Sequence, residues 1–215
     1  MLSIQKKSLV DMVYDKLRES IIQLQLPLGS KLNVNELRDR MGVSCTPIRE
    51  AINRLQQEGL VVYENNVGAH IISLAPHDVI EIQQLGMTLH GAAIHLAMTY
   101  GDRLTIVEQL RKQLEDYADA ETEHDEVMAF KEFLGAYYHN CGNRRLDRHM
   151  LAIQGQQLLL RYIYASCIPQ RAADIEILQQ MLLDTMNGDA DAVCATLQTY
   201  SDQMTRVVET AVTEL

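Results

Sequence analysis

The feature of this sequence that most limits its possible folds is the short spacing of helix-ending glycines and prolines in residues 8–73. Three apolar stripes with helical spacing cover residues 8–26, 33–41 and 44–59, and each ends at a proline or a glycine. Pro47 suits the first turn of the third stripe because its missing N–H group costs nothing there. The segment therefore predicts three short helices joined by tight turns.

Two β-like runs follow the third helix and complete a definite order of elements. Residues 60–63 and 69–73 have the composition of short strands, and the turn-forming residues 64–68 join them. Three short helices followed by a β-hairpin are the order of a winged helix-turn-helix, in which the third helix enters the major groove of DNA. We therefore expect residues 1–73 to form a DNA-binding domain, with residues 74–76 as a linker.

No segment after Pro76 has the pattern of a strand. Helical stripes cover residues 77–100, 102–120, 124–141, 144–166, 170–186 and 189–213. Glycine, proline and asparagine residues mark the breaks between them. Residues 77–215 are therefore expected to form an all-helical bundle, which makes the whole chain mainly α.

The charge is divided unevenly between these two regions. The 215-residue chain has a formal net charge of −10, but residues 1–75 are close to neutral at +1 and the remainder carries −11. Such asymmetry indicates two modules with different partners. A nearly neutral module can still bind DNA if its basic side chains share one face, although its affinity then depends less on bulk electrostatics.

Several classes of protein do not fit the sequence. No apolar run approaches the roughly 18 residues of a membrane span, and the first ten residues lack the apolar core of a secretory signal. The four cysteines are far apart, which favours reduced thiols in the cytoplasm. Phosphate-binding glycine loops and the metalloprotease and hydrolase motifs are missing. We therefore expect a cytoplasmic protein that is not an enzyme and has no membrane partner.

The start of the third predicted helix holds side chains suited to DNA. Hydroxyl groups of Ser44 and Thr46 can bind phosphates together with free helix amides, and Arg49 can bind a guanine or a phosphate. The ordered stretch around them resembles the GntR family of bacterial transcription regulators over residues 8–73. The residues that carry this resemblance are Leu28-Gly29-Ser30-Lys31-Leu32, Glu36-Leu37, Gly42-Val43-Ser44-Cys45-Thr46-Pro47-Ile48-Arg49-Glu50-Ala51-Ile52 and Arg54-Leu55-Gln56-Gln57-Glu58-Gly59-Leu60.

The resemblance implies a homodimer that binds a near-palindromic operator in double-stranded DNA. The expected DNA-binding residues are Arg38, Ser44, Cys45, Thr46, Arg49, Asn65, Asn66 and Gly68. Cys45 stands where the family usually has arginine. An arginine–guanine pair is worth roughly 1–3 kcal/mol of discrimination between bases. We therefore expect this chain to recognise a different operator from its relatives or to bind more weakly.

The helical region resembles, more weakly, the FCD effector domain of the FadR subfamily. The residues that carry this resemblance are Phe133 before Gly142-Asn143 with Leu146, then Met181 and Met186 before Gly188-Asp189, then Ala192 and Ala195. Many FCD domains hold a divalent metal with one aspartate and three histidines. Aligned on these patterns, the four ligand positions are Phe130, Leu134, Leu178 and Tyr200, none of them a strong metal ligand. We therefore expect no metal or other cofactor there.

These four residues, together with Tyr138, are the expected lining of an effector pocket. Such a composition favours a small molecule that is more apolar than a metal-held carboxylate. The alternative is that Phe130, Leu134 and Leu178 are core residues and that the pocket has closed. Tyr200 is the better pocket candidate, since a buried phenol needs a hydrogen-bond partner.

The sequence therefore favours a dimeric transcription regulator, most simply a repressor, whose DNA affinity responds to a small-molecule effector. The alternative is a helical interaction protein that keeps a weakened DNA-binding module and has no effector. Cys45 and the missing metal ligands motivate that second hypothesis. Sequence-specific DNA affinity and its salt dependence distinguish the two.

Overall fold

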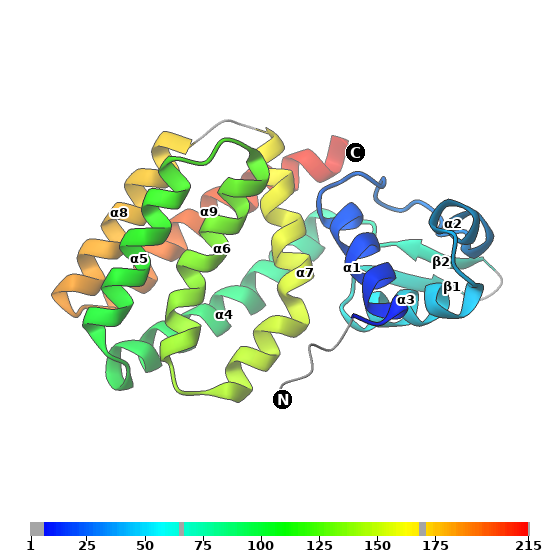
Figure 1. The fold of residues 1–215 in the computed structure, drawn as a ribbon. Helices are drawn as coiled ribbons and strands as arrows, with labels where there is room; N and C mark the ends of the chain where they lie inside the picture. Colours follow the sequence, from blue (N-terminus) through cyan, green and yellow to red (C-terminus); the bar gives the residue numbers. More distant parts are fainter. Residues whose placement is uncertain (1–6, 65–66, 168–170, 215) are drawn as a thin grey trace, which may run out of the picture. The chain divides into compact units, whose positions relative to one another are not determined.

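The computed structural model describes residues 7–64, 67–167 and 171–214. Within these ranges the chain forms nine helices and one two-stranded sheet (Figure 1). Contacts along the chain divide it into two compact units, the first ending at Leu74 and the second beginning at Ala75. The observed order, three helices and a hairpin followed only by helices, confirms the predicted fold class.

The first unit holds both strands. Its elements are α1 (Leu9–Ile22), α2 (Val34–Met41), α3 (Cys45–Gln57), β1 (Val61–Glu64) and β2 (Gly68–Ile71). Local chemistry fixes where the first two helices begin and end. The Ser8 hydroxyl accepts from the Asp11 N–H at 3.1 Å, and the Asp11 carboxylate accepts from the Ser8 N–H at 3.1 Å. The Asn33 side-chain oxygen caps α2 by accepting from the N–H groups of Asn35 and Glu36, and Gly42 closes the helix with φ at 66°, a left-handed conformation that favours glycine.

Helix α1 ends four residues earlier than its apolar stripe predicts. Leu24 has φ at 58°, and the N–H groups of Gln25 and Leu26 both bond back to the Ser20 carbonyl. This turn closes the helix before Pro27. The prediction of a helix to residue 26 was wrong, because the pattern of apolar residues carries no information about a left-handed turn. In addition, the residue before a proline avoids the helical conformation.

The hairpin pairs β1 with β2 in an antiparallel register that runs from Val61 opposite Ile71 to Glu64 opposite Gly68. An isolated bridge between Lys31 and His70 ties the segment before α2 to the hairpin. The strands are shifted from the predicted runs by one or two residues at their ends. The hairpin is thus anchored to the helices at its base.

A buried carboxylate joins the end of α3 to α1. Glu58 caps α3, and its side chain is only 6% exposed. The Tyr14 hydroxyl donates to Glu58 Oε2 at 2.7 Å, and Arg18 Nε donates to Glu58 Oε1 at 2.7 Å. Burial and the neighbouring carboxylate raise the pKa of Tyr14 to about 12, so the phenol remains a donor. We call Tyr14, Arg18 and Glu58 the α1–α3 latch.

The second unit is a bundle in which six long helices follow one another. They are α4 (Pro76–Tyr100), α5 (Arg103–Ala118), α6 (Glu123–Asn140), α7 (Arg144–Cys167), α8 (Arg171–Asn187) and α9 (Ala190–Glu214). Pro76, which was assigned to the linker, instead begins α4, where a proline lacks only an N–H that would be unsatisfied anyway. Asp78 accepts from the Ala75 N–H at 2.7 Å and helps to fix this start.

Helix α4 packs against α9, α7 and α6, while α5 packs against α6 and α8. In Figure 1 the green helix α6 lies between α5 and α7. In the part of the chain that the structure describes, no helix combines the length and the apolar character that a membrane crossing needs.

The latch yields a stability prediction. Replacing Glu58 with alanine leaves the Arg18 guanidinium, 21% exposed, without its partner. Because breaking a buried ion pair costs about 3–5 kcal/mol and Arg18 is partly solvated, we expect a loss of roughly 2–3 kcal/mol of unfolding free energy. Tyr14→Phe removes one hydrogen bond and should cost about 1 kcal/mol.

Urea titration of the whole chain measures the loss of unfolding free energy in Glu58→Ala and in Tyr14→Phe. The transition to follow is that of the first unit. The exposed Glu50 on the same helix provides the control, because Glu50→Ala should change the free energy of unfolding by less than about 0.5 kcal/mol. Equal effects of Glu58→Ala and Glu50→Ala would contradict a structural role for the latch.

Candidate nucleic-acid interface and helical-unit cavity

The inner face of α3 is buried and thereby fixes which side chains point outward. Ile48, Ala51 and Leu55 are fully buried, while Thr46 and Arg49 are exposed. Residues three apart lie on one face of a helix, so Thr46 and Arg49 are neighbours on the outer face. Ser44, also exposed, is the N-cap immediately before them.

The polar groups of this exposed turn are not used within the part of the chain that the structure describes. The Ser44 side chain makes no capping hydrogen bond. Neither Thr46 nor Arg49 has a side-chain hydrogen bond or ion pair among the described residues. The first N–H groups of a helix carry partial positive charge. Together these groups can hold a phosphate and donate to base edges. We call Ser44, Thr46 and Arg49 the α3 tip.

Two further predicted residues lie close to the α3 tip with other contacts. Cys45 is the first residue of α3, and its sulfur lies 4.0 Å from the Asn35 side-chain oxygen. The Arg38 guanidinium on α2 is paired with its neighbour Asp39, at 2.8 Å between Nη2 and Oδ1. An aspartate competes with a phosphate for this guanidinium, so Arg38 is less available than Arg49.

The hairpin supplies a second surface. Gly68 begins β2 with φ at 108°, a backbone conformation that favours glycine, and a Cβ atom there would lie 3.7 Å from Cε of Lys31. The predicted residues Asn65 and Asn66 lie outside the described residues. The exposed Lys31 was not predicted as a DNA contact. Its bridge with His70 on β2, together with the backbone hydrogen bonds of its neighbours Ser30 and Leu32 to the same segment, brings this cation to the hairpin.

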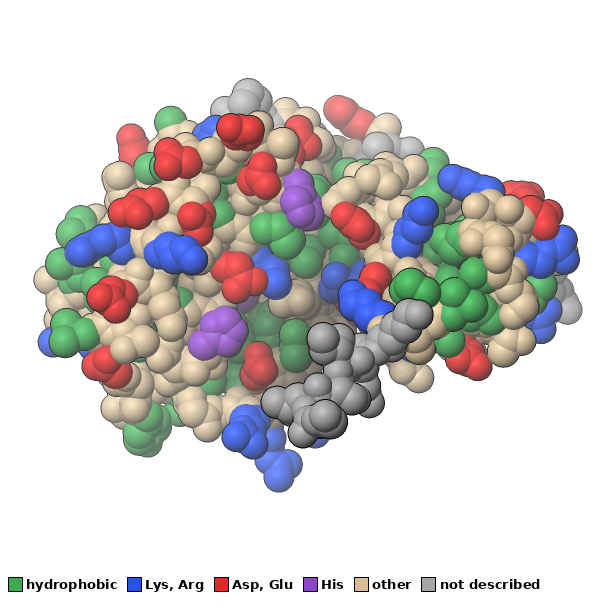
Figure 2. All heavy atoms as spheres, in the orientation of Figure 1, with side chains coloured by type: hydrophobic (Ala, Val, Ile, Leu, Met, Phe, Trp, Pro, Cys, Tyr) green, Lys and Arg blue, Asp and Glu red, His purple; other side chains and the backbone are tan. Residues whose placement is uncertain are grey.

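The second unit contains a cavity of about 210 Å³ among helices α4, α6, α7 and α9. Figure 2 shows a recess between α6 and α7 on one face of this unit, with hydrophobic side chains at its floor. The lining includes Met87, His90, Phe130, Leu134, Tyr138, Leu158, Arg161, Leu197, Tyr200 and Met204. A pocket with an apolar lining and a few polar groups is the usual form of a small-molecule site.

Four of the five predicted pocket residues line this cavity: Phe130, Leu134, Tyr138 and Tyr200. The Phe130 and Tyr200 rings pack with their centroids 4.8 Å apart. The Tyr138 hydroxyl lies 3.1 Å from His90 Nδ1. Leu178 is placed elsewhere, because it is fully buried within the bundle on α8 and does not line the cavity.

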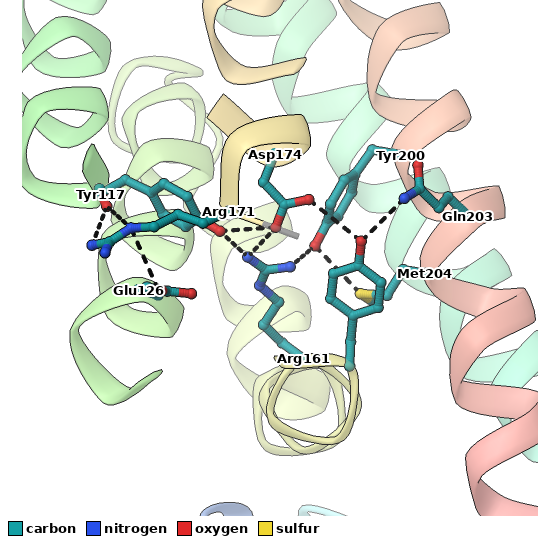
Figure 3. A network of polar contacts seen from close by, with 9 residues as sticks. Tyr117, Glu126, Arg161, Arg171, Asp174, Tyr200, Gln203 and Met204 are labelled. Carbon is teal, nitrogen blue, oxygen red and sulfur yellow. Dashed lines mark hydrogen bonds and ion pairs between the residues drawn. The ribbon is translucent and has the colours of Figure 1, made fainter. Parts of the chain in front are cut away.

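A buried arginine that was not among the predicted pocket residues stands at the cavity wall. Arg161 of α7 has a side chain that is 4% exposed. Its Nη2 donates to the Tyr117 hydroxyl at 2.7 Å and to Asp174 Oδ2 at 2.9 Å, and its Nη1 donates to the Tyr200 hydroxyl (Figure 3). Its Nε is buried without a hydrogen-bond partner among the described residues.

Neighbouring groups keep Arg161 charged in this buried position. Burial opposes the charged form, but Tyr200, Tyr117 and Asp174 outweigh that effect and raise the pKa of Arg161 further. Burial raises the pKa of the Tyr200 phenol, which therefore stays neutral. The signal in the sequence was the run from Leu158 to Tyr164, in which an arginine stands among apolar and aromatic residues. A charge in such a run is rarely buried unless it is paired.

The residues at the four aligned ligand positions do not fit a divalent metal. None of them supplies a carboxylate or an imidazole. The Arg161 guanidinium lies 4.5 Å from the centre of the Phe130 ring and 5.4 Å from that of Tyr200, so a cation of the protein itself already stands beside two of these positions. No group of three or more histidine, cysteine, aspartate or glutamate residues within the described ranges is arranged to hold a metal.

Comparison with known proteins adds evidence from sequence. Residues 9–71 match the family model of bacterial regulatory proteins, gntR family. The chain is 31% identical over 143 residues to YdhC, an uncharacterized HTH-type transcriptional regulator of Bacillus subtilis, over 64% of each chain. It is 26% identical over 190 residues to the Nta operon transcriptional regulator of Aminobacter aminovorans, over 87% of this chain and 90% of that relative.

Similarity of fold extends over both units. A structure from Rhodococcus sp. RHA1, solved as a GntR transcriptional regulator, matches 94% of this chain and 98% of its own with a TM-score of 0.76. The two sequences are 20% identical, so this likeness concerns the fold alone. The chain spans between 31% and 64% of the length of YdhC and two other curated regulators. Residues 9–71 are thus similar in sequence to the gntR family of bacterial regulatory proteins, and they fold as three helices followed by a hairpin, the order of a winged helix-turn-helix.

Proposed function

We propose that the chain is a DNA-binding transcriptional regulator of the GntR type. The observation that carries this proposal is the α3 tip, whose three polar side chains are exposed and unpartnered among the described residues. They lie within the stretch that matches the family model. The relatives named as transcriptional regulators support the same role. A chromosomal DNA reader acts in the bacterial cytoplasm, and regulation of this kind needs no catalysis by the chain itself.

In this account α3 enters the major groove and the hairpin contacts the backbone beside it. Arg49 reads a base edge or holds a phosphate, while the hydroxyls of Ser44 and Thr46 hold phosphates. Cys45 replaces a fork-shaped donor and alters the base preference. Because the unit containing α3 is close to electrically neutral, binding depends more on these positioned contacts than on bulk charge.

The helical unit supplies dimerisation and a response to a small molecule. Two copies related by a twofold axis place two α3 tips on one face of the duplex, which requires a near-palindromic operator. The cavity beside Arg161 is the effector site, and no metal takes part in it. We expect the dimer to have two states that differ in the spacing of the two DNA-reading units. The effector shifts the equilibrium between them only as far as its affinities for the two states differ. The chain acts as a repressor: bound to its operator it blocks transcription, and effector binding releases it.

Selection of the whole chain against a random duplex pool at physiological salt tests this function. Enrichment of a sequence with two inverted half-sites is the expected result. If neither the chain alone nor the chain with a cell metabolite extract enriches a sequence, the proposal fails. The remaining candidate is then a helical interaction protein with a weakened DNA-binding module.

Arg49→Ala should weaken binding to the selected operator by about 5- to 150-fold, since one arginine–base contact is worth roughly 1–3 kcal/mol. Titration of a labelled duplex measures the affinity, and circular dichroism checks that the fold is intact. Lys16→Ala is the matched control, because it removes the same charge from an exposed position on α1 and should change affinity by less than about threefold. Unchanged operator affinity in Arg49→Ala would exclude a role for this residue.

Cys45→Arg should restore a bidentate donor at the first residue of α3. We expect the variant to select operators with a guanine at one additional position in each half-site. Repeating the random-pool selection with this variant reports the change directly. Cys45→Ser, which retains a small side chain, should select the same operator as the original chain. Identical operators for all three proteins would show that residue 45 does not face a base.

A further inference from the structure

The cavity in the helical unit contains a polar atom that the protein itself leaves unused. Arg161 lines this cavity and is almost fully buried. Its two terminal nitrogens are occupied by Tyr117, Asp174 and Tyr200, but its Nε has no hydrogen-bond partner among the described residues (Figure 3). Buried donors are normally satisfied, and each exception needs an explanation. A ligand oxygen that accepts from Nε would supply the missing partner.

The charges around the cavity argue against an anionic ligand. Asp174, at 2.9 Å, already neutralises Arg161. Lys131 and Glu132 of the lining pair with each other at 2.6 Å, and Asp147 adds a negative charge. Burial lowers the pKa of His90 to about 4, so this imidazole is uncharged at neutral pH. A carboxylate entering the cavity would lose its hydration and gain no net positive charge in return.

The remainder of the lining indicates an apolar body of limited size. Phe130 and Leu134 on α6 line the same cavity as Leu197 and Met204 on α9. An apolar cavity of about 150 Å³ holds one benzene molecule, so about 210 Å³ admits one ring with a short polar substituent. The part of a ligand that lies inside the cavity is therefore about this size.

We propose that this cavity binds a small uncharged molecule with one aromatic or alicyclic ring and an oxygen that accepts a hydrogen bond from Arg161 Nε. This inference rests on the proposed function, because it specifies the chemical class of the effector. The fixed Arg161–Asp174 pair orients the oxygen end, and the side chains of α6 and α9 enclose the ring. The cavity thereby distinguishes a carbonyl or ether compound from the matching acid and from the matching hydrocarbon.

Three probes of similar size test this discrimination: acetophenone, benzoate and ethylbenzene. Ligand-observed NMR titrations of the whole chain without DNA give their dissociation constants. Acetophenone should bind at least tenfold more tightly than either of the others. Equal or tighter binding of benzoate would overturn the uncharged class, equal binding of ethylbenzene would overturn the role of Nε, and no binding of any probe would overturn the proposal.

Arg161→Lys isolates the Nε atom. Lysine places a methylene group where arginine has Nε and keeps a cation near Asp174 and Tyr200. In this variant the preference for acetophenone over ethylbenzene should fall below threefold, and an unchanged preference would contradict the inference. Because the operator selection uses DNA and the probe titrations do not, failure of probe binding can be separated from failure of DNA recognition.

A second variant keeps the test decisive if Arg161→Lys does not fold. Met87 lines the cavity from α4 and is only partly buried, so Met87→Trp should fill the space without touching the Arg161 pairs. Acetophenone binding should weaken at least tenfold. Leu104→Trp, at a residue on α5 that is 78% exposed, is the control and should leave binding unchanged. If Met87→Trp also leaves it unchanged, the probe binds elsewhere and the proposal is wrong.

Discussion

Burial of one face of α3 is the constraint on which the proposed DNA-reading surface depends. Ile48, Ala51 and Leu55 enter the small core of the first unit completely, so the rotation of α3 about its own axis is fixed. That rotation leaves Thr46 and Arg49 outside, on the same face. The latch at Glu58 holds the far end of the helix against α1. The α3 tip therefore lies on a packed scaffold. Because its backbone is already ordered, DNA binding costs less conformational entropy than binding by a flexible segment would.

The second unit contains a buried charge, that of Arg161, which is compensated by neighbouring side chains. Arg161 is enclosed by aromatic rings and held by one carboxylate and two phenols. A buried arginine left without Asp174 would be strongly destabilising, because the charge would have neither water nor a partner. The pair thus fixes one wall of the cavity. This fixed wall, together with a lining that offers no unpaired positive charge, gives the cavity a chemical preference that an apolar lining alone would lack.

Much of this fold could be predicted from the sequence, because glycines, prolines and capping residues mark nearly every helix boundary. The end of α1 could not, since the left-handed turn at Leu24 follows from backbone hydrogen bonds and not from an apolar pattern. Alignment with the FCD pattern correctly placed Phe130, Leu134 and Tyr200 in one cavity. It did not identify Arg161, which lines the same cavity. Its partner Asp174 lies thirteen residues away on another helix, and only the tertiary fold brings the two together.

Dimethyl sulfate footprinting on a selected duplex tests the central claim, that two α3 helices read the major groove. The reagent methylates guanine N7 in the major groove and adenine N3 in the minor groove. We expect protection of guanine N7 in two clusters about 10 base pairs apart, on one face of the duplex. Protection confined to adenine N3, or a single cluster, would contradict it, because the protein would then read the minor groove or bind as a monomer.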